Sequence, residues 1–200
     1  MSRRNVEIII SGVGGQGVIL AAEILGNAAM REGLEVIVSE IHGMAQRGGS
    51  VTSHVRIGHK VYSPTIIEGS SNMILGFEPI ETLRSLKFAN KKTRIIMNSK
   101  QTIPITVSIG ASKYPSLEEV VAQCKKFTKH VTVLDAFKIA ETAGSSMTVN
   151  MVLLGALVKT SMLPIREKIL VQTITDNVPQ KFVDLNLKAF DAGKNALPIC

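Results

Sequence analysis

The chain has 200 residues, of which 45% are hydrophobic, 20% are charged and 4% are aromatic. This length and composition suit one globular domain with an aliphatic core. The formal net charge is +7, the aromatic residues are too few for a base-stacking nucleic-acid surface, and no uninterrupted apolar run reaches 18 residues. We therefore expect a single domain over residues 1–200, without a membrane span. Because the polar, basic residues 1–5 are not followed by the apolar region and cleavage site of a secretory signal, we expect the protein in the cytoplasm.

The first third of the chain has the pattern of a β-α-β unit. Residues 6–11, with three consecutive isoleucines at 8–10, are predicted to form a buried strand of a parallel sheet. Residues 18–31 carry apolar side chains at helical spacing, and Gly33 is placed to end that helix. A second strand is predicted over residues 34–39, ending at Glu40, and the crossover between the two strands should be right-handed.

The middle of the chain alternates short strands with irregular stretches. Residues 51–57 alternate apolar and polar side chains, which predicts a half-exposed strand, and residues 61–62 are expected to pair back as a short hairpin strand. Residues 63–69 should be irregular. A core strand is predicted over residues 73–77, a helix from Pro79 to about residue 89, and a strand over residues 94–98 with a short extension at 103–107.

The last part of the chain is mainly helical. Ser116 and Glu119 form a capping box that opens a helix reaching about residue 127, and residues 131–134 form the last strand. Asp135 and Gly144 delimit a short helix. Further helices are predicted over residues 147–160, 165–176 and 179–192, the last closed by Gly193. This order predicts a three-layer α/β fold, with a mostly parallel Rossmann-like sheet, helices on both faces and a helical C-terminal third.

A glycine-rich loop follows the first predicted strand. Gly12, Gly14, Gly15 and Gly17 match the G-x-G-x-x-G fingerprint in the strand–loop–helix context that dinucleotide sites require. Glycines allow positive φ and close backbone approach, and the following helix offers free N–H groups to an anion. Glu40, 23 residues after Gly17, stands where such sites carry an acid for the ribose. The alternative is that the glycines only allow a tight turn.

A second loop with polar side chains follows the second predicted strand. His42, Gln46, Arg47, Gly48 and Gly49 fall within eight residues, in the kind of position where open α/β sheets bind ligands. Arg47 could pair with a carboxylate or phosphate, and His42 could exchange protons near neutral pH. A purely structural loop is the alternative, but we favour a binding or interface role.

No catalytic or metal-binding group is assigned in this chain. Ser63, Pro64 and Glu68 lie in the second irregular stretch without a nucleophile–base motif around them. The remaining histidines show no metal-ligand spacing. Cys124 and Cys200 are the only cysteines, too few for a four-cysteine iron–sulfur or zinc site.

The positive charge is unevenly placed along the sequence. Between Thr82 and Leu117 there is no acidic residue, whereas the same stretch contains seven basic ones: Arg84, Lys87, Lys91, Lys92, Arg94, Lys100 and Lys113. Such a stretch could dock an acidic protein or a polyanionic ligand, although a solvated basic face is the simpler interpretation.

Several segments resemble a known family. GVGGQGVILAAEILGNAA, SEIHGMAQRGGSVTSHVRIG, VYSPTIIEG and FEPIETLR are similar to the gamma-type domain of 2-oxoacid:ferredoxin oxidoreductases. Within that family, HGMAQRGGSV and YSPTIIEG are most similar to the small (beta) subunits that serve indolepyruvate. NMVLLGALVK and FVDLNLKAFDAG extend the resemblance, so that it runs from Val6 to about Gly193.

The resemblance implies a subunit that is not active alone. The complete enzyme would convert arylpyruvates and CoA to aryl-acetyl-CoA and CO₂ while reducing ferredoxin. Thiamine diphosphate and [4Fe–4S] clusters would lie in a large partner subunit, in a heterotetramer of two large and two small subunits. The alternatives are the gamma subunit of another 2-oxoacid:ferredoxin oxidoreductase and an NAD(P)-dependent reductase that uses residues 12–17 and Glu40.

The residues that match the family's motifs are the expected cofactor- or partner-binding positions. They are Gly12, Gly14, Gly15, Gly17, His42, Gln46, Arg47, Gly48, Gly49, Ser63, Pro64 and Glu68. We expect the loops over residues 42–49 and 63–68 to lie together at one edge of the sheet and to face the large subunit. The basic stretch 82–117 then has two expected ligands, ferredoxin and CoA.

Overall fold

The computed structural model describes residues 5–43, 48–103, 107, 110 and 113–197. Its strands are β1 (Val6–Val13), β2 (Glu35–His42), β3 (Ser50–Gly58), β4 (Met73–Gly76), β5 (Arg94–Asn98) and β6 (Val131–Leu134). Its helices are α1 (Val18–Arg31), α2 (Pro79–Arg84), α4 (Leu117–Phe127), α5 (Ala136–Ala143), α6 (Val149–Lys159), α7 (Glu167–Asn177) and α8 (Val183–Asn195). Short 3₁₀ turns cover Ser85–Phe88, Ser146–Thr148 and Gln180–Phe182.

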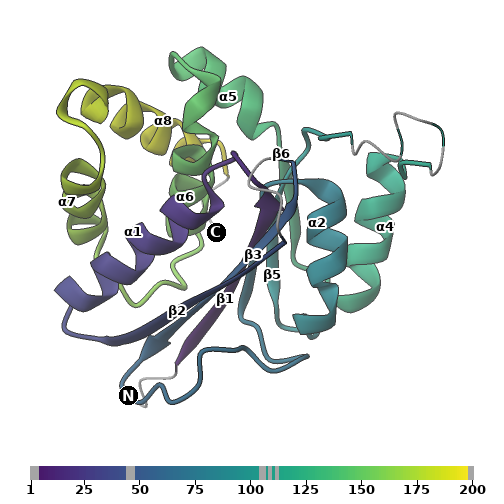
Figure 1. Cartoon of the computed structure of the whole chain (residues 1–200), viewed down its shortest axis with the longest axis horizontal. Coiled ribbons are helices and arrows are strands. Elements are labelled where there is room, and N and C mark those ends of the chain that lie inside the picture. Colours follow the sequence, from purple (N-terminus) through teal and green to yellow (C-terminus); the bar gives the residue numbers. More distant parts are fainter. Residues whose placement is uncertain (1–4, 44–47, 104–106, 108–109, 111–112, 198–200) are drawn as a thin grey trace.

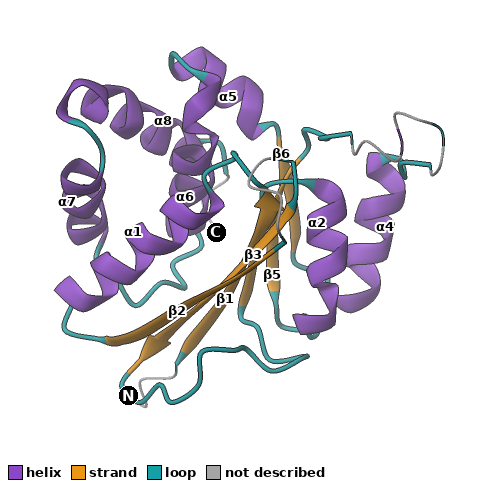
Figure 2. Ribbon diagram, viewed as in Figure 1, coloured by secondary structure: helices purple, strands orange, loops and turns teal. Residues whose placement is uncertain are grey.

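The strands form one mixed sheet in the order β2-β3-β1-β4-β5-β6. Neighbouring strands from β1 through β4 and β5 to β6 are parallel, whereas β3 runs antiparallel to both β1 and β2. Helices α1 and α5–α8 cover one face of the sheet, and α2 and α4 cover the other (Figures 1 and 2). The predicted α/β class, the mostly parallel sheet and the helical C-terminal third are therefore confirmed.

Each face of the sheet carries its own hydrophobic core. Ile8 and Ile10 of β1 belong to the larger core, with the buried sides of α1 and α6, and Ile9 belongs to a smaller core with residues such as Phe88 and Val120. Successive side chains of a strand point to opposite faces. The middle of a strand covered on both sides therefore carries apolar side chains on consecutive residues, which explains the three isoleucines at 8–10.

The local signals at the helix ends are confirmed. Gly33 follows α1 with φ +77°, the left-handed conformation that a glycine accepts most readily. Ser116 and Glu119 form both hydrogen bonds of the capping box at α4, with N–O distances of 3.2 and 2.8 Å. Asp135 caps α5 by accepting a hydrogen bond from the amide of Lys138.

Two predictions about the middle of the chain are wrong. β3 is mostly buried rather than half-exposed, because it lies between β1 and β2 and its His54 is only 1% exposed. Residues 61–62 form no strand. The amide of Val61 instead donates to the side chain of Glu35, and Tyr62 is 83% exposed. The predicted extension at 103–107 falls largely outside the described residues, and Ile103 is in no strand.

Gly193 does not end the last helix. It lies inside α8, where a Cβ atom would come within 1.9 Å of the carbonyl oxygen of Val152 in α6. Gly155 of α6 has the same role, because a Cβ there would lie 2.0 Å from the carbonyl oxygen of Phe190. These glycines let the two helices pack backbone to backbone. None of the described helices has the length and apolar character that a bilayer span requires.

Candidate functional site

The glycine loop joins the end of β1 to the start of α1. Gly15 and Gly17 have φ values of +99° and +81°, which are strained for residues with a side chain. At Gly12, a Cβ atom would lie 2.7 Å from the Cβ of Phe77. At Gly17, it would lie 2.8 Å from the side-chain nitrogen (Nδ2) of Asn150. The loop therefore needs glycine both for its conformation and for its packing.

Gln16 holds this loop in shape from within. Its side-chain oxygen accepts a hydrogen bond from the amide of Val13 at 2.8 Å, and its side-chain nitrogen donates to the hydroxyl of Thr102 at 3.2 Å. Gly17 is the N-cap of α1 and offers no side chain to the first turn. The first amide groups of α1 thus find no acceptor on an N-cap side chain, and their binding of an anion stays a prediction.

The two glycine-bearing stretches predicted from separate parts of the sequence meet. The amide of Gly14 donates to the carbonyl oxygen of Gly49 at 2.8 Å, and the amide of Gly48 donates to that of Gly14 at 3.3 Å. His42, at the end of β2, is in register with Val51 of β3, which is in register with Gly12 of β1. The C-terminal ends of β1 and β2 and the start of β3 thus meet at one edge of the sheet.

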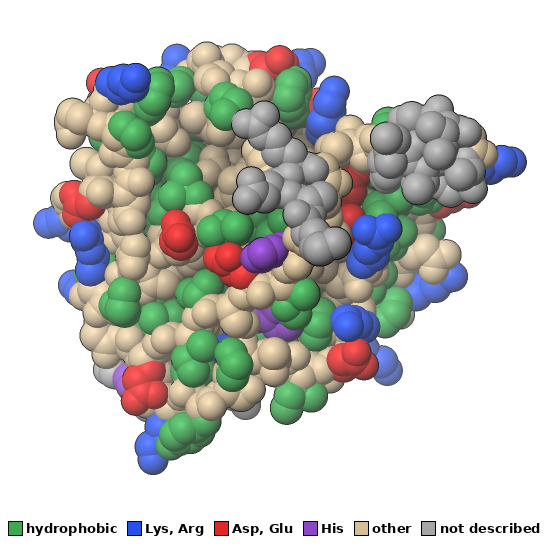
Figure 3. Space-filling view, viewed as in Figure 1, with side chains coloured by type: hydrophobic (Ala, Val, Ile, Leu, Met, Phe, Trp, Pro, Cys, Tyr) green, Lys and Arg blue, Asp and Glu red, His purple; other side chains and the backbone are tan. Residues whose placement is uncertain are grey.

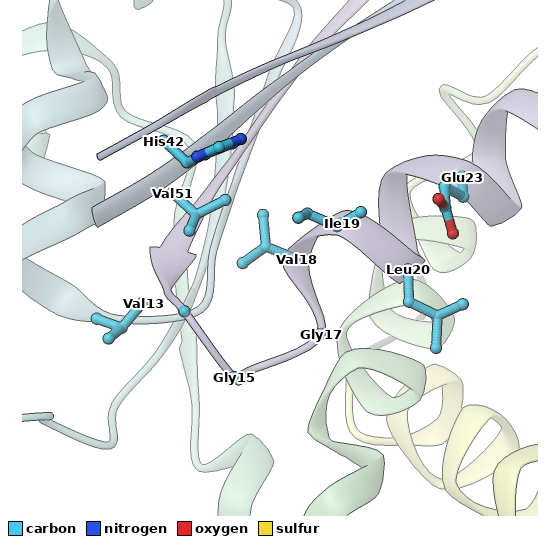
Figure 4. A pocket seen from close by; sticks show the side chains of 10 residues that line it. Val13, Gly15, Gly17, Val18, Ile19, Leu20, Glu23, His42 and Val51 are labelled. Carbon is cyan, nitrogen blue, oxygen red and sulfur yellow. The ribbon is translucent and has the colours of Figure 1, made fainter. Parts of the chain in front are cut away.

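A cavity of about 620 Å³ opens at this edge (Figure 4). It is lined by Val13, Gly14, Gly15, Gly17, Val18, Ile19, Leu20, Glu23, His42 and Val51. In Figure 4, His42 and Val51 lie on the strand side, the glycine loop passes below, and α1 forms the opposite wall. The lining is mainly apolar, with His42 and Glu23 as its ionisable side chains and the loop amides as further polar groups.

Not every predicted site residue can be placed at this cavity. His42 is exposed and lines it, whereas Gln46 and Arg47 lie outside the described residues, so their binding role stays a prediction. Gly48 and Gly49 reach the site through their backbone bonds to Gly14.

Ser63, Pro64 and Glu68 lie elsewhere. The carbonyl oxygen of Ser63 accepts from Arg56, and that of Pro64 accepts from the hydroxyl of Ser39, both at 2.7 Å. Ser39 and His42 are three positions apart in β2, so they point to opposite faces of the sheet. The described parts of the two loops therefore do not lie together as predicted. The second loop is instead fastened over the α2 side of the sheet.

Glu68 is exposed and lies 3.6 Å from the ammonium group of Lys87. The ion-pair partner of Glu68 is thus a lysine of the basic stretch.

The sequence interpretation missed two buried carboxylates beside the site. Glu78 is 1% exposed and Glu81 is 5% exposed. Glu78 caps α2 by accepting from the amide of Glu81 at 3.0 Å, and its other oxygen accepts from the amide of Thr102 at 3.2 Å and from the hydroxyl of Tyr114. Burial, reinforced by the bond to Glu78, raises the pKa of Tyr114, so its hydroxyl stays protonated and remains a donor.

Glu81 connects the same short helix to the loop after β2. It accepts from the hydroxyl of Ser50, which follows Gly49, at 2.5 Å and from the guanidinium of Arg84 at 2.6 Å. Thr102 in turn joins Glu78 to Gln16 of the glycine loop. The two carboxylates therefore link three loops at this edge of the sheet. The only sequence signal was the position of Glu78, directly between a predicted core strand and Pro79 at the start of a predicted helix. That position marks a helix N-cap but does not by itself predict a buried carboxylate.

Glu40 is not placed to serve as the acidic residue of a dinucleotide site at the glycine loop. Strand β3 lies between β1 and β2, so Glu40 is in register with Ser53 and, one strand further, Ile10. Two strand spacings place its backbone about 10 Å from that of β1. A Rossmann site needs the second strand next to the first. Glu40 and the glycine loop therefore do not form the predicted ribose and phosphate pair.

The described residues contain no cluster of three or more His, Cys, Asp or Glu that could hold a metal ion. Cys124 is buried, and burial raises the pKa of its thiol to about 11, so it is neither a ready nucleophile nor a ready metal ligand.

Fold and site together define a class: an α/β domain with a mixed six-stranded sheet and a cleft beside its glycine loop. Comparison with known proteins makes this specific. The family model "Pyruvate ferredoxin/flavodoxin oxidoreductase" matches residues 7–196, and the chain belongs to this family.

Relatives and solved structures agree with this assignment. The indolepyruvate oxidoreductase subunit IorB of Archaeoglobus fulgidus is 44% identical over 190 residues, covering 95% of this chain and 94% of that one. A pyruvate/ketoisovalerate oxidoreductase common subunit gamma, from Pyrococcus abyssi, is 31% identical and covers 77% of each chain. Among solved structures, the keto/oxoacid ferredoxin oxidoreductase gamma subunit from Geobacter sulfurreducens is similar, with a TM-score of 0.68, 25% identity and coverage of 95% and 96%.

Proposed function

We propose that this chain is the small subunit of an indolepyruvate:ferredoxin oxidoreductase, which oxidises arylpyruvates with CoA to aryl-acetyl-CoA and CO₂. The observation that carries the proposal is the gradient of similarity: 44% identity over nearly the whole chain to an indolepyruvate oxidoreductase subunit, against 31% over 77% to a pyruvate/ketoisovalerate subunit. The runner-up is the gamma subunit of another 2-oxoacid:ferredoxin oxidoreductase. Such subunits have the same fold, but the sequence identity of this chain to them is lower.

Thiamine diphosphate and the [4Fe–4S] clusters belong to a large partner subunit in this proposal. Two cysteines cannot supply the four thiolates of a cluster, and Cys124 is buried with a raised pKa. When bound in the partner, thiamine would supply the carbanion chemistry of decarboxylation, and the clusters would carry electrons to ferredoxin. This chain would complete the rim of that site, within a heterotetramer of two large and two small subunits.

The cleft at the glycine loop supports such a role. Its apolar walls would bury a side chain of the partner or an apolar part of a ligand, while the amides at the start of α1 would receive an anionic group. An anionic group of CoA and an acidic side chain of the large subunit both suit that position. His42 is exposed and lines the cleft, so it would donate a hydrogen bond to either one.

The test is co-purification with the large thiamine- and cluster-binding subunit, followed by an assay of indolepyruvate-dependent viologen reduction with CoA. The proposal expects turnover with indolepyruvate well above that with pyruvate or 2-oxoglutarate. Preference for pyruvate or 2-oxoglutarate would support the runner-up. Tight NAD(H) binding and dehydrogenase activity of the isolated chain would refute both and restore the dinucleotide reductase.

A further inference from the structure

A basic surface lies at the end of the sheet opposite the glycine loop. We define the basic end surface as Lys91, Lys92, Arg94, Lys125, Lys126 and Lys129. The first three residues precede or begin β5, and the others lie at or just after the C-terminal end of α4. Because β1, β4 and β5 run parallel, the start of β5 and the end of β1 are at opposite edges of the sheet.

Folding brings the two halves of this surface together. The hydroxyl of Thr128 donates to the carbonyl oxygen of Thr93 at 2.7 Å, and the amide of Ile95 donates to that of His130 at 2.9 Å. The stretches 91–94 and 125–129 therefore lie side by side, although about thirty residues of sequence separate them. In Figure 3, several Lys and Arg side chains lie on the right-hand side, where Figure 1 places α4.

The structure also divides the basic stretch 82–117 noted in the sequence. Arg84 is bonded to the buried Glu81, and Lys87 lies near Glu68. Lys100 follows the other end of β5 and stacks over the ring of Phe137 at 4.8 Å. The stretch is thus not one surface, and the end of α4 together with the residues just after it supplies the other half of the basic end surface.

This surface holds most of the excess charge of the chain. The sequence has 23 Lys and Arg against 16 Asp and Glu. Without the six residues of the basic end surface, 17 basic side chains would face 16 acidic ones, so the rest of the chain is close to neutral. There is no acidic residue in the sequence between Thr82 and Leu117, nor between Val120 and Leu134. Such an asymmetry orients the molecule towards an acidic partner during approach.

The residue types favour a transient partner. All five lysines are exposed, and Phe127, between Lys126 and Lys129, is 41% exposed. Exposed lysines are depleted from the cores of permanent interfaces. They suit fast, salt-sensitive encounters, and weak redox complexes have interfaces at the small end of the size range.

We propose that the basic end surface docks the acidic face of a redox protein that accepts electrons from the complete enzyme. The inference depends on the proposed function, in which ferredoxin is that acceptor. It assigns the encounter with the acceptor to Lys91, Lys92, Lys125 and Lys126, leaving the glycine-loop edge to the large subunit and its substrates.

The test measures the apparent KM of the assembled enzyme for an acidic ferredoxin at two salt concentrations. These are roughly 20 mM, below physiological ionic strength, and roughly 500 mM, above it. Lys91→Glu/Lys92→Glu should raise this KM about tenfold at low salt and about twofold at high salt, because screening removes the charge effect. Lys125→Gln/Lys126→Gln should raise it less. Lys168→Glu/Lys188→Glu, in α7 and α8, makes the same change of net charge elsewhere and should leave the KM unchanged.

Viologen separates this proposal from the proposed function. If the wild-type enzyme fails to reduce viologen with indolepyruvate, the proposed function is wrong. If viologen reduction is normal in every variant and the ferredoxin KM is the same in the Lys91/Lys92 variant and the Lys168/Lys188 control, the docking proposal is overturned. Loss of the large subunit from the Lys91/Lys92 variant on gel filtration would also overturn it, because the surface would then be an assembly interface. Binding of a DNA duplex at physiological salt, lost in the same variant, would likewise assign the surface to another class of partner.

Discussion

The hydrogen bond between Glu78 and Tyr114 gives the sharpest prediction about the candidate site. Glu78→Gln keeps the size of the side chain but replaces one of its two acceptor oxygens by an NH2 group. One carboxylate oxygen accepts from the amide of Glu81 and the other from Thr102 and Tyr114, so one of the two backbone amides is left without its acceptor. A buried donor without a partner costs about 1–3 kcal/mol, and the lost charge-assisted bond adds to this. We expect Glu78→Gln to lower the free energy of unfolding by about 2–3 kcal/mol.

A double-mutant cycle isolates the bond. Tyr114→Phe alone leaves one carboxylate oxygen with one donor fewer, at an expected cost of about 1–2 kcal/mol. The double variant should be less destabilised than the sum of the two single variants, with a coupling energy of about 1–2 kcal/mol measured by urea unfolding. Ser116→Ala removes the N-cap of α4, whose hydrogen bonds involve neither Glu78 nor Thr102, and is the matched control at about 1 kcal/mol.

The site itself should respond differently to these variants. Because Thr102 joins Glu78 to Gln16 of the glycine loop, Glu78→Gln should weaken binding to the large subunit or raise the KM for CoA. Ser116→Ala should do neither at a comparable loss of stability. A coupling energy below about 0.5 kcal/mol, or equal functional losses in both variants, would refute the role assigned to Glu78.

Three further predictions concern stability. Burial, followed by the charges of Lys87 and Arg56, lowers the pKa of His54 below 6.5, so the unfolded chain binds the proton more readily. The stability gained by keeping His54 neutral is therefore complete above about pH 6.5 and is lost as the pH falls towards the lowered pKa. The urea unfolding midpoint should fall as the pH is lowered from about 7.5 to about 5, and His54→Gln should abolish this dependence. Gly17→Ala should cost more in thermal unfolding than Gly33→Ala, since both have positive φ but only Gly17 abuts another side chain; equal costs would count against the packing argument. Gly193→Ala should cost at least about 3 kcal/mol, and a well-folded, equally stable variant would contradict the close contact between α6 and α8.

Much of the fold could be predicted because its signals are local. The apolar run of β1, the capping box at Ser116 and the glycine after α1 each act within a few residues, and each is found where expected. The exposure of β3 could not be predicted in this way. It depends on the insertion of β3 between β1 and β2, which is a long-range choice of strand order that the alternating pattern does not encode. Gly193 was misassigned for a related reason, because its contact is with a helix forty residues earlier.

The candidate site was predicted in part. The glycine fingerprint and the Gly48–Gly49 pair could be identified from composition, and their backbone bonds join them. Ser63 and Pro64 were expected at the same edge, yet Arg56 and Ser39 hold them over the opposite face. Glu78 and Glu81 were missed because a carboxylate in a short surface-type helix is usually solvated, and only the fold reveals that both are buried.

The most direct test of the central claim is reconstitution of the large thiamine- and cluster-binding subunit with and without this chain. Methyl viologen reduction is followed with indolepyruvate and CoA as substrates. The account predicts a stable complex whose indolepyruvate-dependent reduction requires this chain, and no activity of either part alone. Full activity of the large subunit by itself, or a complex without indolepyruvate-dependent reduction, would contradict it.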